Sequence, residues 1–75
     1  MKKIIIDNFR INDNVLITSY NPPLKGRVFD MYEVESHMIP DETLKSMYPK
    51  MVPIFEVMME DGKLRSFVKD VVKKG

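Results

Sequence analysis

The sequence predicts a mainly β protein, folded as a small barrel of five or six short strands with one short helical insertion. Its 75 residues are enough for one small domain. Isoleucine and valine are plentiful whereas alanine and glutamine are absent, and this balance favours strands over helices. Turn-forming residues separate the apolar segments at short intervals. A barrel is the economical solution for such short strands, because it leaves few exposed edges.

The first half of the chain contains three expected strands. The β-branched run 2–6 and the segment 15–20 each favour an extended conformation. The two prolines at 22–23 must end the second strand, because proline cannot donate to a β-ladder. A turn is expected at residues 25–26. The segment 27–35, which is rich in valine and aromatic residues, is the third strand.

Residues 36–51 differ from the rest of the chain, and we expect them to form a long loop inserted between two strands. Residues 40–48 have acidic side chains early and a lysine later, the order that a helix dipole prefers, and Pro49 ends this stretch. The pattern predicts one or two helical turns around residues 40–48. A long loop is unusual in a compact domain and often carries function.

The second half of the chain contains an expected hairpin and a last short strand. Residues 52–60 form a strand with one apolar face, and Pro53 near their start indicates an edge position. The pair Asp61-Gly62 is typical of a type I′ turn, in which both central residues have positive φ. The return strand covers residues 64–68. A tight turn then leads to a last strand at 71–73.

Two features of the composition disfavour whole classes of protein. Without cysteine, the chain cannot form a disulfide, a zinc–thiolate site or a cysteine nucleophile. The apolar run 4–6 is too short for a signal peptide, which needs about 7–15 apolar residues, or for a membrane span, which needs about 20. We therefore expect a soluble, cytoplasmic protein that makes no membrane contact and holds no cofactor.

Two adjacent segments resemble the KOW motif of SH3-like barrels. Residues 14–17 correspond to its first strand. Residues 25–28 place Gly26 two positions before Val28, the residue that opens the next strand of the motif. In place of the glycine-rich first part of the motif's loop, this chain has the residues 19–23. The family includes modules of transcription elongation factors and ribosomal proteins, so the resemblance implies contacts with nucleic acid.

Later segments are similar to the remaining strands of such a barrel. Residues 55–57, 61–63 and 68–71 resemble its closing hairpin, short turn and final strand. The resemblance covers residues 9–73 apart from the insertion, and it implies one SH3-like domain over 1–75. It also implies that the first and last strands are neighbours in the sheet.

Charge is distributed unevenly along the chain, although the formal net charge is only +1. Residues 1–27 hold five bases against two acids, residues 28–62 two against eight, and residues 63–75 five against one. If the two ends meet in a barrel, one face is basic and the other acidic. A basic face attracts phosphates and is a candidate nucleic-acid-binding surface. Its candidate residues are Lys2, Lys3, Lys25, Arg27, Lys63, Arg65, Lys69, Lys73 and Lys74.

The acidic middle of the chain and the methionine-rich insertion form a second candidate surface, for a protein partner. An acidic face can occupy a nucleic-acid-binding site by mimicking phosphates, and methionine adapts to different partners. The candidate residues are Asp30, Tyr32, Glu33, Glu35, Met38, Asp41, Glu42, Met47 and Tyr48. For the apolar side chains of the insertion, packing back on the barrel is preferred over exposure.

The aromatic residues of the first loop and the third strand leave two alternatives open. Exposed, Tyr20, Phe29 and Tyr32 would stack on bases or hold a peptide. The preferred alternative is that Phe29 belongs to the core and that the tyrosines cover the ends of the barrel, because buried aromatics dominate small cores.

No constellation of residues indicates catalysis or a metal site. His37 is the only histidine, and the nearby acids Glu35 and Asp41 alone do not make a metal site, since metal ligands come in clusters. Ser36, His37 and Asp41 include the residue types of a hydrolase triad, but adjacent side chains on an extended segment point apart. We therefore expect neither an enzyme nor a metal-binding protein.

Three functions fit this pattern. We prefer a non-enzymatic interaction module: a small accessory or inhibitory protein of phage type that docks on a larger host protein, such as a nucleic-acid-processing enzyme. The near-neutral total charge favours it, because dedicated nucleic-acid-binding domains usually have a larger basic excess. The first alternative is a KOW-like nucleic-acid-binding module. The second is a self-assembling structural protein in which the strand at 4–6 pairs with another copy.

Overall fold

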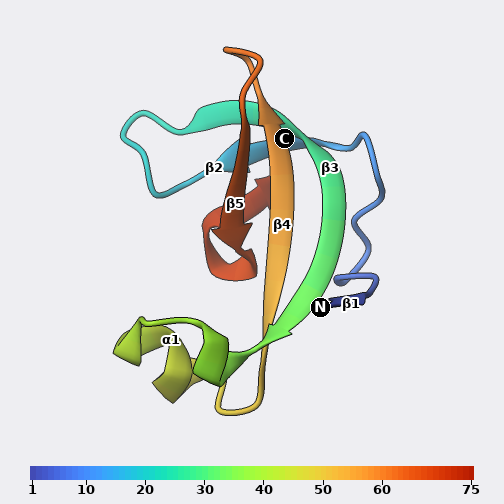
Figure 1. Ribbon diagram of the computed structural model, residues 1–75. Helices are drawn as coiled ribbons and strands as arrows, with labels where there is room; N and C mark the ends of the chain where they lie inside the picture. The colour runs from blue at the N-terminus through green and yellow to red at the C-terminus, as the bar shows by residue number, and fades with distance from the viewer.

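The computed structural model describes all 75 residues and shows six antiparallel strands with one short α-helix (Figure 1). The strands are β1 (Lys2–Lys3), β2 (Asn14–Ile17), β3 (Leu24–Glu35), β4 (Met51–Met59), β5 (Leu64–Val68) and β6 (Val72–Lys74). The helix α1 (Glu42–Met47) and the 3₁₀ turns η1 (Ser36–Met38) and η2 (Lys69–Val71) complete the fold. The predicted mainly β class with one short helical insertion is confirmed. No helix has the length and apolar character that crossing a membrane requires.

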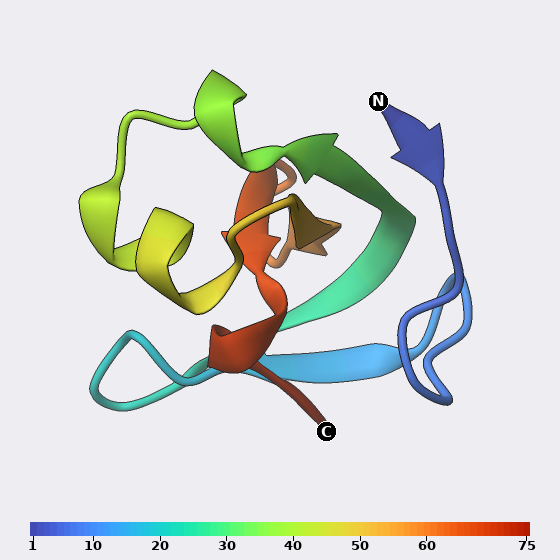
Figure 2. The same cartoon turned by 90° about the horizontal axis from the view of Figure 1, so that it is seen from below.

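The strands form one sheet in the order β5-β4-β3-β2-β6, and β1 also pairs with β3. β3 is the central element, because one edge pairs first with β2 and then with β1 while the other edge pairs with β4. Figure 2 shows that β3 bends strongly. As a result β2, which pairs with the start of β3, lies across the domain from the end of β3. The last strand, β6, pairs with β2, whereas the first strand, β1, pairs with β3, so the first and last strands are not neighbours in the sheet.

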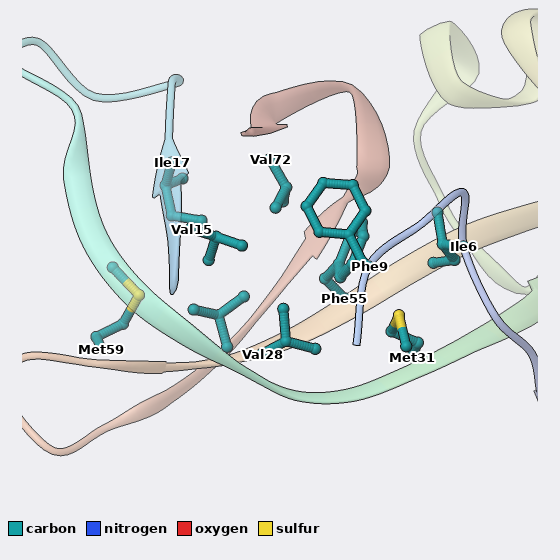
Figure 3. Close-up of a cluster of buried hydrophobic side chains, with 10 residues drawn as sticks. Ile6, Phe9, Val15, Ile17, Val28, Met31, Phe55, Met59 and Val72 are labelled. Carbon is teal, nitrogen blue, oxygen red and sulfur yellow. The ribbon is translucent and has the colours of Figure 1, made fainter. Parts of the chain in front are cut away.

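Ten buried apolar side chains form the core inside this bent sheet (Figure 3). They come from β2, β3, β4 and β6, and from the loop after β1, which contributes Ile6 and Phe9. The rings of Phe9 and Phe55 meet edge to face with centroids 4.8 Å apart, a favoured aromatic geometry. Residues 5–13 therefore close one end of the sheet with their own side chains.

The boundaries of β1 and β3 differ from the predicted ones. β1 ends at Lys3, because Ile6 enters the core and Asp7 adopts a positive φ of 49°. β3 begins at Leu24 and runs through the predicted turn. Gly26 serves close packing instead of a turn, since a Cβ there would lie 2.4 Å from Cγ1 of Val57.

The predicted hairpin between β4 and β5 is present, but its turn is not type I′. Within this turn, only Gly62 has a positive φ, of 82°. Its N–H donates to the carbonyl of Met59, and the N–H of Met59 donates to the carbonyl of Lys63, so a tight turn is followed by one left-handed residue. The predicted edge position of Pro53 is wrong for β4 as a whole, which lies between β3 and β5. However, β5 pairs only with residues 54–58, so Pro53 breaks no bond to it.

Candidate functional site

The insertion, defined here as residues 36–50, leaves the sheet at the end of β3 and returns at the start of β4 (Figure 1). Ser36 closes its base. The Ser36 N–H donates to the carbonyl of Lys50, and the Ser36 hydroxyl donates to the carbonyl of Pro49, each at 2.9 Å. The serine side chain is buried with its hydrogen-bonding group satisfied, so the two ends of the insertion are held together.

The helix α1 inside the insertion is capped and tied to the barrel. The carboxylate of Asp41 accepts hydrogen bonds from the N–H groups of Thr43 and Leu44, which is the N-cap arrangement. The hydroxyl of Tyr48 donates to the carboxylate of Asp70 in η2 at 2.9 Å. Burial, together with the hydrogen bond to Asp70, raises the pKa of Tyr48 to about 12. The insertion is therefore a fixed element and not a free loop.

Two methionines of the insertion point into solvent. Met38 is 71% exposed and Met47 is 52% exposed. The prediction that the apolar side chains pack back on the barrel is wrong for both, whereas Leu44 and Tyr48 are half-buried. Leu44 and Tyr48 are thus the side chains of the helix region that pack inward, whereas Met38 and Met47 lie on the outside.

The predicted acidic surface divides into two parts, and the first lies along the sheet. Tyr32 is buried and its hydroxyl donates to Glu56, so it is not available to a partner. Burial raises the pKa of Tyr32. Asp30 forms an ion pair with Lys3, which lowers the pKa of the Asp30 carboxyl. Of the two predicted carboxylates here, only the half-buried Glu33 has no ion-pair partner.

The second part of the acidic surface lies on or beside the insertion. Glu35 is 3.1 Å from His37, and Glu42 is 3.7 Å from Lys45. All of these contacts are at the surface, and Asp41 is occupied by the helix cap. No group of three or more histidine, cysteine, aspartate or glutamate residues lies close enough together to hold a metal ion.

The twelve lysine and arginine residues divide into two groups by their partners. Five form ion pairs, which are Lys3–Asp30, Lys45–Glu42, Arg65–Asp61, Lys69–Asp7 and Lys74–Asp13. The other seven, Lys2, Arg10, Lys25, Arg27, Lys50, Lys63 and Lys73, form none. A neighbouring carboxylate partly neutralises each ion-paired base, so the unpaired bases are the better candidates for binding an external anion.

The two basic ends of the chain do not merge into one face, contrary to the prediction. β1 pairs with the second half of β3, where Lys2 lies opposite Glu33 and Lys3 opposite Tyr32. β6 pairs with β2 instead. Lys2 and Lys3 therefore lie beside the acidic part of β3. Residues 4–6, the run that was predicted to pair with a second copy, lie outside β1, and Ile6 of this run is buried in the core.

Three of the unpaired bases do gather, on the outer side of β2, β3 and β6. Leu16 lies directly opposite Lys25 on one side and Lys73 on the other, so the three side chains share one face of the sheet. Arg27 follows Lys25 by two residues and is exposed on the same face. We call Asn14, Leu16, Lys25, Arg27 and Lys73 the β2–β3 face.

Two open depressions lie on the β2–β3 face. They measure about 440 and 380 Å³ and share Asn14, Lys25 and Gly26. Arg27 lines one of them, together with the acidic Glu60. The face is thus a hollowed surface with a basic border.

Phe29 is a candidate residue that the sequence interpretation assigned wrongly to the core. It is 52% exposed, next to a β-bulge at which the pairing of β3 with β4 shifts between Val28 and Asp30. Alternation accounts for this exposure, because Gly26 and Val28 point inward in the structure and residue 29 therefore points outward. Tyr20 is less exposed, at 38%, and its ring lies edge-on to Phe67.

No family model, curated protein or solved structure matches this chain. The insertion and the β2–β3 face are the two surfaces whose geometry suggests a role in binding.

Proposed function

We propose that this protein is a small, cytoplasmic, non-enzymatic interaction module with an SH3-like barrel, which docks on a larger protein through the insertion. The observation that carries the proposal is the exposure of Met38 and Met47 on a segment that is fixed at its base and at its helix. Burying exposed apolar side chains against a partner is favourable, because it removes them from water. A fixed segment also loses less conformational entropy on binding than a free loop does.

The chemistry of the insertion suggests the kind of surface that it fits. Methionine has a flexible, polarisable side chain that fills irregular apolar pockets. Glu35 and Glu42 flank the methionines with carboxylates that are exposed and only weakly paired. A partner with an apolar pocket and a basic rim would complement this surface, and the charges would mainly raise the rate of association. Enzymes that process nucleic acids have basic surfaces of this kind because they bind phosphates, and this supports an accessory or inhibitory role on such an enzyme.

The test is affinity capture from nuclease-treated lysate of the source organism, comparing three forms of the protein. The first is the wild type and the second is the double variant Met38→Ser/Met47→Ser. The third is Leu64→Ser, which removes an apolar side chain of similar exposure (46%) from β5. We expect a protein that the wild type and Leu64→Ser retain and the double variant does not. Equal capture by all three forms, at equal thermal stability, would contradict docking through the insertion.

A further inference from the structure

We infer that the β2–β3 face, extended along β3 to Phe29, binds single-stranded nucleic acid. This inference concerns a different surface from the insertion and does not depend on the docking proposed there. Lys25, Arg27 and Lys73 lie on the face, and none of them forms an ion pair. Unpaired bases around an open depression are suited to the phosphates of a nucleic acid backbone.

The register of the strands defines the spacing of these bases. Neighbouring strands lie about 4.8 Å apart, so Lys73 and Lys25, with β2 between them, are separated by about 10 Å at the backbone. Arg27 follows Lys25 at about 7 Å along β3. Lys25 lines both depressions and Arg27 lines one of them, whereas Lys73 lies on the other side of β2 from Lys25. The three charges therefore share one face of the sheet, and two of them line its depressions.

Phe29 provides the second independent observation. Lys25, Arg27 and Phe29 are alternate residues of β3 and all are exposed, while Gly26 and Val28 between them are buried. A half-exposed phenylalanine inside a strand gains little from the core, but its ring offers a platform on which a base can stack. Bulges often re-aim a side chain in this way. Two cations followed by an aromatic ring thus form a strip about 13 Å long.

The combination of unpaired basic residues with an exposed aromatic ring favours a single strand over a duplex. A base can stack on Phe29 only if it is unpaired and turned out of its own strand's stack. Acidic residues limit the strip, since Asp30 follows Phe29 directly and Glu60 lines the same depression as Lys25 and Arg27. The site is therefore short. It has room for a few nucleotides, and three cations neutralise about three phosphates.

The counterion model turns this count into a measurable quantity. For single strands, the slope of log affinity against log salt concentration is about −0.7 for each phosphate neutralised, which gives about −2 for three contacts. Removing two of the three bases should bring the slope to about −0.7. Stacking on one ring contributes enough that its loss weakens binding by about fivefold or more.

The experiment measures fluorescence anisotropy of labelled oligothymidine and oligouridine, and of a DNA duplex of equal length, at several salt concentrations. The test variants are Lys25→Gln/Arg27→Gln and Phe29→Leu. The matched control is Lys2→Gln/Lys50→Gln, which removes the same charge from two lysines that also form no ion pair. Thermal unfolding of each variant verifies that the fold is retained.

We expect the wild type to bind the single strands in preference to the duplex, with a salt slope of about −2. Lys25→Gln/Arg27→Gln should weaken binding by about tenfold or more at low salt, Phe29→Leu by about fivefold, and the control by less than about twofold. No binding at low salt would overturn the inference. Equal losses in the test and control double variants, or tighter binding to the duplex that Phe29→Leu does not affect, would overturn it as well.

Discussion

Lys73 and Lys74 are adjacent in β6, yet they face two different regions of the molecule. Lys74 lies 3.2 Å from the carboxylate of Asp13, donates to the carbonyl of Asn8 at 2.8 Å and lies 5.3 Å above the ring of Phe9. It joins the last strand to the loop that closes the core. Lys73 lies opposite Leu16 on the β2–β3 face and has no ion-pair partner. Because side chains alternate along a strand, these two adjacent lysines have different roles. Lys74 holds the fold together, whereas Lys73 is free to bind a ligand.

The largest difference is expected between two phenylalanines of these regions. Phe9→Ala should cost about 3 kcal/mol, because it removes a ring that is 9% exposed and packs against Phe55. Phe29→Ala should lower the free energy of unfolding by only about 1 kcal/mol, since Phe29 is already 52% exposed. Urea unfolding of both variants measures the difference. Comparable losses would show that Phe29 contributes to the core.

A smaller effect is expected from acid on the contacts around Lys74. The N–H of Arg10 and the ammonium of Lys74 lower the pKa of the Asp13 carboxyl below its ordinary value of 3.8. A carboxyl with a lowered pKa in the folded state stabilises the fold above pH 3.8, and this contribution is lost as the pH falls below that value. Asp13→Asn should therefore be less stable than the wild type at pH 6, and the gap should narrow by pH 2.5. Urea midpoints at the two pH values test this. A gap of constant size would contradict a role for the carboxylate charge.

Much of the fold follows from patterns within a few residues. The strand at 64–68 has the predicted bounds, and the hairpin and the helix near 42–47 lie where turn and capping residues place them. The errors arise where distant parts of the chain meet. The run 2–6 is a good strand by propensity, but it does not continue as a strand after Lys3, because Ile6 and Phe9 enter the core and close one end of the sheet. Gly26 looks like a turn residue until Val57, 31 positions later in the sequence, lies against it.

The candidate sites show the same limit. Lysine and glutamate content predicts charged surfaces, and the individual residues Lys25, Arg27 and Lys73 were among the predicted bases. Which bases are neutralised depends on contacts such as Lys69–Asp7 and Lys74–Asp13, whose partners are 62 and 61 positions apart. Local sequence does not encode such pairs.

The most direct test of this division of roles compares Lys73→Gln with Lys74→Gln, which remove the same charge from adjacent positions. Oligothymidine binding and urea unfolding are measured for both. Lys73→Gln should weaken binding and reduce the magnitude of the salt slope by about 0.7, without changing the unfolding midpoint. Lys74→Gln should lower the stability by about 1 kcal/mol, through the lost hydrogen bond and cation–π contact, and leave binding as in the wild type. If both variants lose binding equally, or if Lys73→Gln destabilises the fold as much as Lys74→Gln, the two regions do not have separate roles.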